Sequence, residues 1–378
     1  MSAPARDRRF RRAAACAALL ALAACHGGGK DAAPPAAAKG APQGRLRWTA
    51  ETRGGIDSTP AVAADGTIYV WGGVAATEDD RGQPLPAGRV RLALMAVDAS
   101  GHITRTLPGS LQTGFPPRRL WVSLASGGTA YGVDDAGGLY IMAGDGTQSF
   151  HVTGDFLHGP AAISQSGRLF CDANRGMVAI DPGDPSGPRI VSKSEDGGFN
   201  QAVAVGPDGT VYVGTSGGVA AIDAAGERRW LARARASTPV VDGQGRIYFS
   251  DRNRLVALHV AGGERWHYEA ADALTIPALS PEGVIVVGAA GLLQVFSHDG
   301  EKRWSFPLAT QSWTPPTAGP DGTVYVTDRG ALLTAVAPGG QVRWSLKLPV
   351  AGSSAGVGPD GTVYVQGGDG RLRAVGPP

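Results

Sequence analysis

Short runs of alternating apolar residues, each bounded by glycine, proline or aspartate, recur along most of the chain. Residues 202–233 show the pattern clearly, because AVAV, TVYV, VAAID and RRWLAR are separated by GPDG, TSGG and AAGE. Apolar side chains at every second position between turn residues indicate β-strands. The segment therefore predicts four short strands joined by tight turns.

This four-strand unit occurs eight times. Its marker is a turn followed by the second strand, which opens at Thr67, Thr129, Arg168, Thr210, Arg246, Val284, Thr323 and Thr362. The intervals are 62, 39, 42, 36, 38, 39 and 39 residues, a period typical of propeller blades rather than helical repeats. An insertion at about residues 74–89 accounts for most of the long first interval. We predict an all-β fold, an eight-bladed β-propeller of four-stranded antiparallel blades over residues 45–378.

The last unit stops after its third strand, RLRAV at residues 371–375. A spare strand, RLRW at residues 45–48, stands at the other end of the predicted propeller. We expect this N-terminal strand to complete the last blade. Such pairing closes the ring and leaves no open sheet edge between the first and last units.

Tryptophan recurs in the fourth strands, and one of these strands carries a family motif. Residues 221–230, AIDAAGERRW, resemble the tryptophan-docking motif of the quinoprotein-type (PQQ-like) eight-bladed propellers through Ala221, Asp223, Gly226 and Trp230. In that family the outer-strand tryptophan packs against the backbone of the neighbouring blade. The resemblance implies this docking role for Trp48, Trp230, Trp266, Trp304 and Trp344.

The first 24 residues have the order of a signal peptide, with a basic start followed by an apolar run over residues 13–24. The run is too short to span a bilayer. The next residue completes LAAC, which resembles a bacterial lipobox and implies lipidation of Cys25; the alternative is a plain secretory signal. Residues 25–44, rich in Ala, Gly and Pro, are expected to form a flexible tether.

The residue after Cys25 bears on the membrane that holds the anchor. In enterobacterial lipoproteins an aspartate at this position favours retention in the inner membrane, whereas this chain has His26. The resemblance implies an outer-membrane lipid anchor, with the propeller in the periplasm or at the cell surface.

Composition and charge narrow the possible partners and stabilising bonds. The chain has 57 glycines and 27 prolines, as many tight turns require. Without the first 24 residues it carries 30 basic and 32 acidic side chains, which excludes an extended basic surface for nucleic acid. With Cys25 lipidated and Cys16 removed, Cys171 is left without a disulfide partner, and we expect its thiol to be buried.

Candidate chemistry is sparse. The seven histidines are scattered over different units, no calcium loop is complete, and no nucleophile elbow occurs. Quinone-dependent dehydrogenases of the resembled family hold pyrroloquinoline quinone (PQQ) with a calcium ion, and many have a disulfide between adjacent cysteines. This chain has no adjacent cysteines. We predict no catalytic residue, metal or cofactor; a PQQ- and calcium-dependent dehydrogenase is the alternative.

Function is expected on the face formed by the turns between second and third strands and by the blade-to-blade crossings, because loops there are more varied. Arginine and tryptophan are enriched at interface hot spots. The candidate partner or ligand residues on this face are Trp121, Arg175, Arg252, Trp313 and Arg329. The alternative for the arginines is solvated pairing with neighbouring aspartates, which contributes little.

The sequence therefore predicts a monomeric, lipid-anchored propeller that binds a protein partner of the cell envelope. This plan is similar to that of the propeller lipoproteins of the outer-membrane β-barrel assembly machinery, which implies a partner in that machinery. A propeller that binds a small ligand such as a sugar, with Trp121 and Trp313 lining an open funnel, is the other alternative.

Overall fold

Eight sheets of four antiparallel strands make up the described part of the chain. The computed structural model describes residues 42–378 apart from residues 54–58, 81, 86, 110–119, 155, 175, 183–188, 193–201, 216 and 313. Among these residues, none lies in a helix long and apolar enough to cross a membrane. The prediction of an all-β propeller with eight four-stranded blades is confirmed.

Each blade consists of strands consecutive in the chain, except the last. Blades 1 to 4 contain β2 (Ala61–Val62), β3 (Ile68–Ala75), β4 (Val90–Val97), β5 (Ile103–Pro108); β6 (Leu120–Leu124), β7 (Ala130–Asp134), β8 (Gly138–Met142), β9 (Gln148–Val152); β10 (Ala162–Ile163), β11 (Leu169–Ala173), β12 (Gly176–Ile180), β13 (Arg189–Ser192); and β14 (Val203–Val205), β15 (Val211–Thr215), β16 (Gly218–Ile222), β17 (Arg228–Arg233). Blades 5 to 8 contain β18 (Val240–Val241), β19 (Ile247–Asp251), β20 (Arg254–Leu258), β21 (Glu264–Glu269); β22 (Ala278–Ser280), β23 (Gly283–Val287), β24 (Leu292–Phe296), β25 (Lys302–Pro307); β26 (Thr317–Ala318), β27 (Val324–Thr327), β28 (Leu332–Val336), β29 (Val342–Lys347); and β30 (Gly356–Val357), β31 (Val363–Gln366), β32 (Arg371–Gly376), with β1 (Arg45–Glu51).

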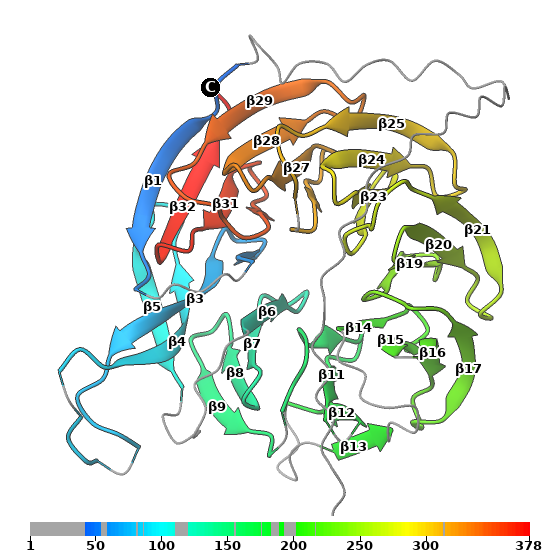
Figure 1. Cartoon of the computed structure of the whole chain (residues 1–378). Helices are drawn as coiled ribbons and strands as arrows, with labels where there is room; N and C mark the ends of the chain where they lie inside the picture. Colours follow the sequence, from blue (N-terminus) through cyan, green and yellow to red (C-terminus); the bar gives the residue numbers. More distant parts are fainter. Residues whose placement is uncertain are drawn as a thin grey trace, which may run out of the picture. The chain divides into compact units, whose positions relative to one another are not determined.

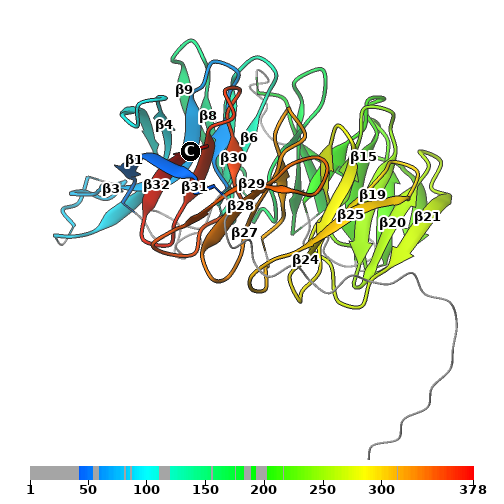
Figure 2. The same cartoon turned by 90° about the horizontal axis from the view of Figure 1, so that it is seen from above.

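The blades stand side by side around an axis, with the first strand of each blade innermost (Figure 1). First strands of neighbouring blades contact one another, as β2 contacts β6 and β30. Seen from the side, the blades form one layer with turns on its two faces (Figure 2). The turns between strands one and two and between strands three and four form the short-turn face. The other connections form the loop face.

The ring is closed by pairing the two ends of the described chain. β1 pairs antiparallel with β32, from Arg45 opposite Gly376 to Glu51 opposite Arg371, and supplies the outer strand of blade 8 (Figure 1). Thr52 continues the contact, because its amide and its hydroxyl both donate to the carbonyl of Gly370. The predicted closure by the N-terminal strand is confirmed.

Three residues ahead of β1 also pair with the propeller. Gln43 forms a parallel bridge with Ser345 of β29, the Gly44 amide donates to the Ser345 carbonyl at 2.9 Å, and the Ser345 amide donates to the Pro42 carbonyl at 3.1 Å. These residues fall within the stretch predicted to be tether. They differ from that prediction because their backbone groups form hydrogen bonds with the outer edge of β29. Such backbone pairing requires no alternation of apolar side chains in the sequence.

The core lies between blades, and each apolar cluster combines side chains of two neighbouring blades. The second-strand aromatic residues are all buried: Tyr69, Tyr131, Phe170, Tyr212, Tyr248, Tyr325 and Tyr364. Cys171 of β11 is fully buried in the cluster between blades 2 and 3, and burial raises the pKa of its thiol to about 12. Packing of blade on blade therefore supplies the hydrophobic stabilisation.

The outer-strand tryptophans lie against the turn between strands three and four of the next blade. The Trp230 Nε1 donates to the Val260 carbonyl at 2.9 Å, and a Cβ on Gly262 would lie 2.6 Å from the indole. The tryptophan and glycine pairs are Trp48 with Gly101, Trp230 with Gly262, Trp266 with Gly300, Trp304 with Gly340, and Trp344 with Gly44. Gly44 thus occupies at the ring closure the place that a turn glycine holds elsewhere.

Candidate functional site

Trp121 lies on β6, the innermost strand of blade 2. Its carbonyl accepts a hydrogen bond of 3.1 Å from the Nε1 of Trp71, a fully buried side chain of β3 in blade 1. Its own half-buried indole packs against the cluster that contains Val133 and Leu157. Contacts from both neighbouring blades therefore fix the position of this tryptophan.

A pocket of about 400 Å³ opens beside Trp121. Its lining residues are Trp121, Asp135, Phe156, Leu157, His158 and Asn174. Asp135 belongs to the turn between β7 and β8, Asn174 to the turn between β11 and β12, and residues 156–158 to the crossing from blade 2 to blade 3. The pocket, here called the Trp121 pocket, therefore lies on the loop face.

The crossing that forms one wall of this pocket is held by backbone bonds. Leu157 forms a bridge with Ala173, and the Asn174 amide donates to the Phe156 carbonyl at 3.2 Å. His158 Nε2 lies 2.7 Å from the Asn174 Oδ1. Leu157 is fully buried while Phe156 is 47% exposed, so the crossing anchors one apolar side chain in the core and presents an aromatic ring to solvent.

The opposite wall depends on a buried carboxylate. Asp134 accepts hydrogen bonds from the amides of Ala136 and Gly138 and from the Tyr140 hydroxyl at 3.1 Å, and it thereby fixes the turn that carries Asp135. Burial raises the pKa of Asp134 although these hydrogen bonds lower it. Because these three donors lie within blade 2 and two of them are amides at the turn, the carboxylate shapes the turn.

Of the predicted arginines, Arg252 and Arg329 are exposed on turns of the loop face, in blades 5 and 7. Arg329 Nη1 lies 3.4 Å from Gln311 Oε1. Asp328 is buried and accepts hydrogen bonds from the backbone amides of Thr310 and Leu332. Neither arginine lines the Trp121 pocket. The structure spreads these candidates around the face instead of gathering them.

Three predicted residues, Cys25, Arg175 and Trp313, lie outside the described residues. Phe156 and the pocket residues around it were missed by the sequence analysis. Their signal was an aromatic and aliphatic pair inside a loop, DFLHG at residues 155–159, where turn residues are the rule. An apolar pair in a blade crossing is a sign of a surface pocket or contact.

The insertion forms a long hairpin on the same face. β3 and β4 pair over eight residues each, from Ile68 opposite Val97 to Ala75 opposite Val90, and extend beyond the ring (Figure 1). Its loop is fastened by an ion pair of 2.9 Å between Arg91 Nη1 and Asp80 Oδ1. Blade 1 neighbours blade 2, so this hairpin and the Trp121 pocket occupy adjacent parts of the loop face.

No group of three or more His, Cys, Asp or Glu side chains among the described residues is placed to hold a metal ion. The adjacent cysteines of many PQQ-dependent dehydrogenases have no counterpart in the sequence.

A known protein family matches the second half of the chain. The family described as "Outer membrane protein assembly factor BamB" matches residues 174–291, 215–312 and 289–376, which together cover more than half of the chain. These ranges contain blades 4 to 7 in full. No curated protein sequence matches.

Many solved structures are similar to this chain, among them the two that follow. BamB from Moraxella catarrhalis superposes with a TM-score of 0.59 at 17% identity, over 88% of this chain and 99% of that chain. A streptogramin B lyase superposes with a TM-score of 0.53 at 12% identity, over 88% of this chain and 98% of that chain. At such low identity these similarities concern the propeller fold alone.

Proposed function

Because this chain belongs to the family of the outer-membrane protein assembly factor BamB, we propose that it is a non-catalytic scaffold of the bacterial cell envelope that binds a protein partner. In this proposal a lipid on Cys25 anchors the protein to the outer membrane, and the partner belongs to the machinery that assembles outer-membrane proteins. The loop face of the propeller binds that partner.

The observation that carries this proposal is the Trp121 pocket with the exposed Phe156 at its edge. Interface hot spots are typically aromatic side chains in well-packed pockets surrounded by polar groups. Here Trp121 and Leu157 provide the apolar part, while Asp135, His158 and Asn174 provide hydrogen-bonding groups.

Cross-linking and co-purification of the tagged full-length protein from envelopes test the proposal. We expect recovery of a component of the outer-membrane assembly machinery. Phe156→Ala should weaken binding by about thirtyfold or more and reduce that recovery accordingly, since hot-spot truncations cost ~2 kcal/mol or more. Val260→Ala is the matched control, because Val260 is 51% exposed on the short-turn face.

Two outcomes would contradict the proposal in different ways. Recovery of partners without any assembly component would exclude the role in outer-membrane assembly. Equal recovery by the Phe156→Ala variant and the wild type would exclude the Trp121 pocket as the binding site.

A further inference from the structure

A second pocket, of about 590 Å³, opens on the short-turn face between blades 5 and 6. Blade 5 contributes the turn between β18 and β19, and blade 6 contributes the turns that follow β22 and β24. The lining residues are Val241, Asp242, Gly243, Gln244, Arg246, Leu279, Ser280, Pro281 and His298. We call it the inter-blade groove.

The groove arises where blade 5 departs from the repeat. Blades 4, 7 and 8 have the turn Gly-Pro-Asp-Gly-Thr, whereas blade 5 has Asp-Gly-Gln-Gly-Arg over residues 242–246. Both kinds of turn are closed by the same pair of backbone hydrogen bonds. For example, the Gly245 amide donates to the Asp242 carbonyl in blade 5, as the Gly209 amide donates to the Gly206 carbonyl in blade 4. Asp242 therefore replaces a glycine and Arg246 replaces a threonine.

This replacement moves the carboxylate from the rim to the interior. In the standard turns the aspartate bonds a threonine and an outer-strand arginine of its own blade, and 46 to 62% of its side chain is exposed: Asp208 with Arg229, Asp321 with Arg343, Asp360 with Arg47. The Asp242 side chain is only 7% exposed. Arg265, the blade 5 counterpart of Arg229, instead lies 3.0 Å from Asp299 of blade 6.

Asp242 has its acceptor sites filled from within blade 5. One oxygen accepts the amides of Gln244 and Arg246, and the other accepts Arg246 Nε at 2.5 Å and the Tyr248 hydroxyl at 3.1 Å. Burial and the nearby Asp242 raise the pKa of Tyr248, so its hydroxyl stays protonated and donates. The charge of Asp242 is thus neutralised by Arg246.

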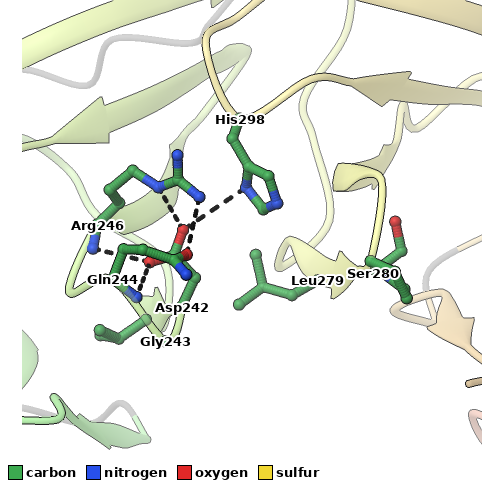
Figure 3. A pocket seen from close by; sticks show the side chains of 9 residues that line it. Asp242, Gly243, Gln244, Arg246, Leu279, Ser280 and His298 are labelled. Atoms are coloured by element: carbon green, nitrogen blue, oxygen red, sulfur yellow. Dashed lines mark hydrogen bonds and ion pairs between the residues drawn. The ribbon is translucent and has the colours of Figure 1, made fainter.

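His298 of blade 6 faces this cluster with one nitrogen and the groove with the other. Its Nδ1 lies 3.1 Å from the Tyr248 hydroxyl and 3.5 Å from a carboxylate oxygen of Asp242, which the ring faces (Figure 3). Because the Tyr248 hydroxyl donates its hydrogen bond to Asp242, it accepts one from His298, so Nδ1 is the protonated nitrogen of the ring. The Nε2 lone pair is then directed to the groove.

The imidazole ring of His298 is neutral near pH 7 because its pKa is lowered. Burial and the positive charge of Arg246 lower its pKa, and the carboxylates of Asp242 and Asp299 only partly oppose them. Arg265 adds a further positive charge on the same side. The groove thus offers a hydrogen-bond acceptor at His298, an amide donor at Gln244 and an apolar wall at Leu279 and Pro281.

We propose that the inter-blade groove binds a neutral polyhydroxylated molecule of saccharide size. A hydroxyl group both donates and accepts, as the facing imidazole and amide require, and the carbon skeleton of a sugar covers an apolar wall. An anion would find its cation already paired with Asp242. The volume lies within the range of small-molecule sites. The proposal is independent of partner binding on the loop face.

Titration of the full-length protein with glucose and trehalose tests the proposal, with glucuronate and inorganic phosphate as charged comparators. The readouts are the melting temperature and the ring nitrogen resonances of His298. We expect the neutral sugars to raise the melting temperature and to shift the His298 Nε2 signal. The signals of His102, a histidine in the corresponding turn of blade 1, should stay unchanged.

Two isosteric variants separate the two nitrogens of His298. Asparagine places its amide near the Nδ1 position and glutamine near the Nε2 position. His298→Asn should weaken sugar binding by roughly five- to tenfold, the effect of one lost hydrogen bond, and His298→Gln should weaken it less. His102→Asn is the matched control and should leave the affinity unchanged.

The wild-type titration decides the proposal even where a variant does not fold. Absence of any shift at His298 up to the solubility limit of both sugars would overturn it. Tighter binding of glucuronate or phosphate than of the sugars at His298 would overturn the assigned ligand class.

Discussion

Replacement of Gly262 by alanine probes the contact that joins one blade to the next. Gly262 has a φ of +87°, and its Cα lies against the Trp230 indole, so that a Cβ would be 2.6 Å from the ring. Gly209 is a matched control, since its φ is +80° and nothing lies within 4 Å of its Cβ position. Both residues close turns by donating to a carbonyl three residues earlier.

The two alanine variants share one cost and differ in another. Placing a non-glycine residue in the left-handed region costs roughly 1–2 kcal/mol at either position. Only Gly262→Ala also forces a methyl group into the Trp230 ring, and overpacking of this kind costs about 1–3 kcal/mol. The difference between the variants is therefore the cost of placing a methyl group against the Trp230 indole.

Thermal unfolding monitored by calorimetry measures this difference. Unfolding entropies of about 2 cal/mol/K per residue imply that each kcal/mol shifts the melting temperature by roughly 1.5 °C in a folded region of this size. Gly262→Ala should therefore melt roughly 1–4 °C below Gly209→Ala. Equal melting temperatures would refute the reasoning, because the indole would then yield to a methyl group without loss.

Three further outcomes are expected. Trp48→Ala should lower the free energy of unfolding, measured with denaturant, by about 2–4 kcal/mol, because it removes the hydrogen bond of 2.8 Å to the Ala99 carbonyl and the ring packing at the closure. Leu46, on the same strand, is 45% exposed, so Leu46→Ala should have little effect. Burial alone would raise the pKa of Asp242, but hydrogen bonds from Arg246 and the charge of Arg246 lower this pKa below the ordinary value. The ionised carboxylate therefore stabilises the fold above the unfolded pKa of about 3.9, and this stabilisation is lost as the pH falls through the folded pKa. The melting temperature of the wild type should accordingly exceed that of Asp242→Asn at pH 6 by more than at pH 3, and a constant difference would contradict this sign. Cys171, with a thiol pKa of about 12, should resist alkylation until denaturant is added, as peptide mapping by mass spectrometry will show; rapid labelling of the native protein would contradict its burial.

Alternation and turn chemistry made the blades predictable. The strands are short, mainly apolar runs bounded by turn residues, and glycines such as Gly66 and Gly209 adopt positive φ where the turns require it. The ring closure was predictable as well, because one unit lacked an outer strand and residues 45–48 supplied a spare one. Local sequence suffices where local backbone geometry decides the structure.

The pairing of residues 42–44 and the two pockets could not be predicted in the same way. Backbone groups alone attach Gln43 to β29, and they leave no mark in the side-chain pattern. The groove at Asp242 and His298 depends on how two neighbouring blades face each other, since Tyr248 and His298 are 50 residues apart in the chain. Only the departure of residues 242–246 from the repeated turn was visible in the sequence.

The entry of the chain at residues 42–44 has a mechanical consequence. These residues run straight into β1, the strand that holds the first and last blades together. Tension applied to the N-terminal segment would act along β1 and load its row of hydrogen bonds to β32 in shear, with the contacts to Ser345 as the first to carry it. Such tension would therefore act first on the strand that closes the ring.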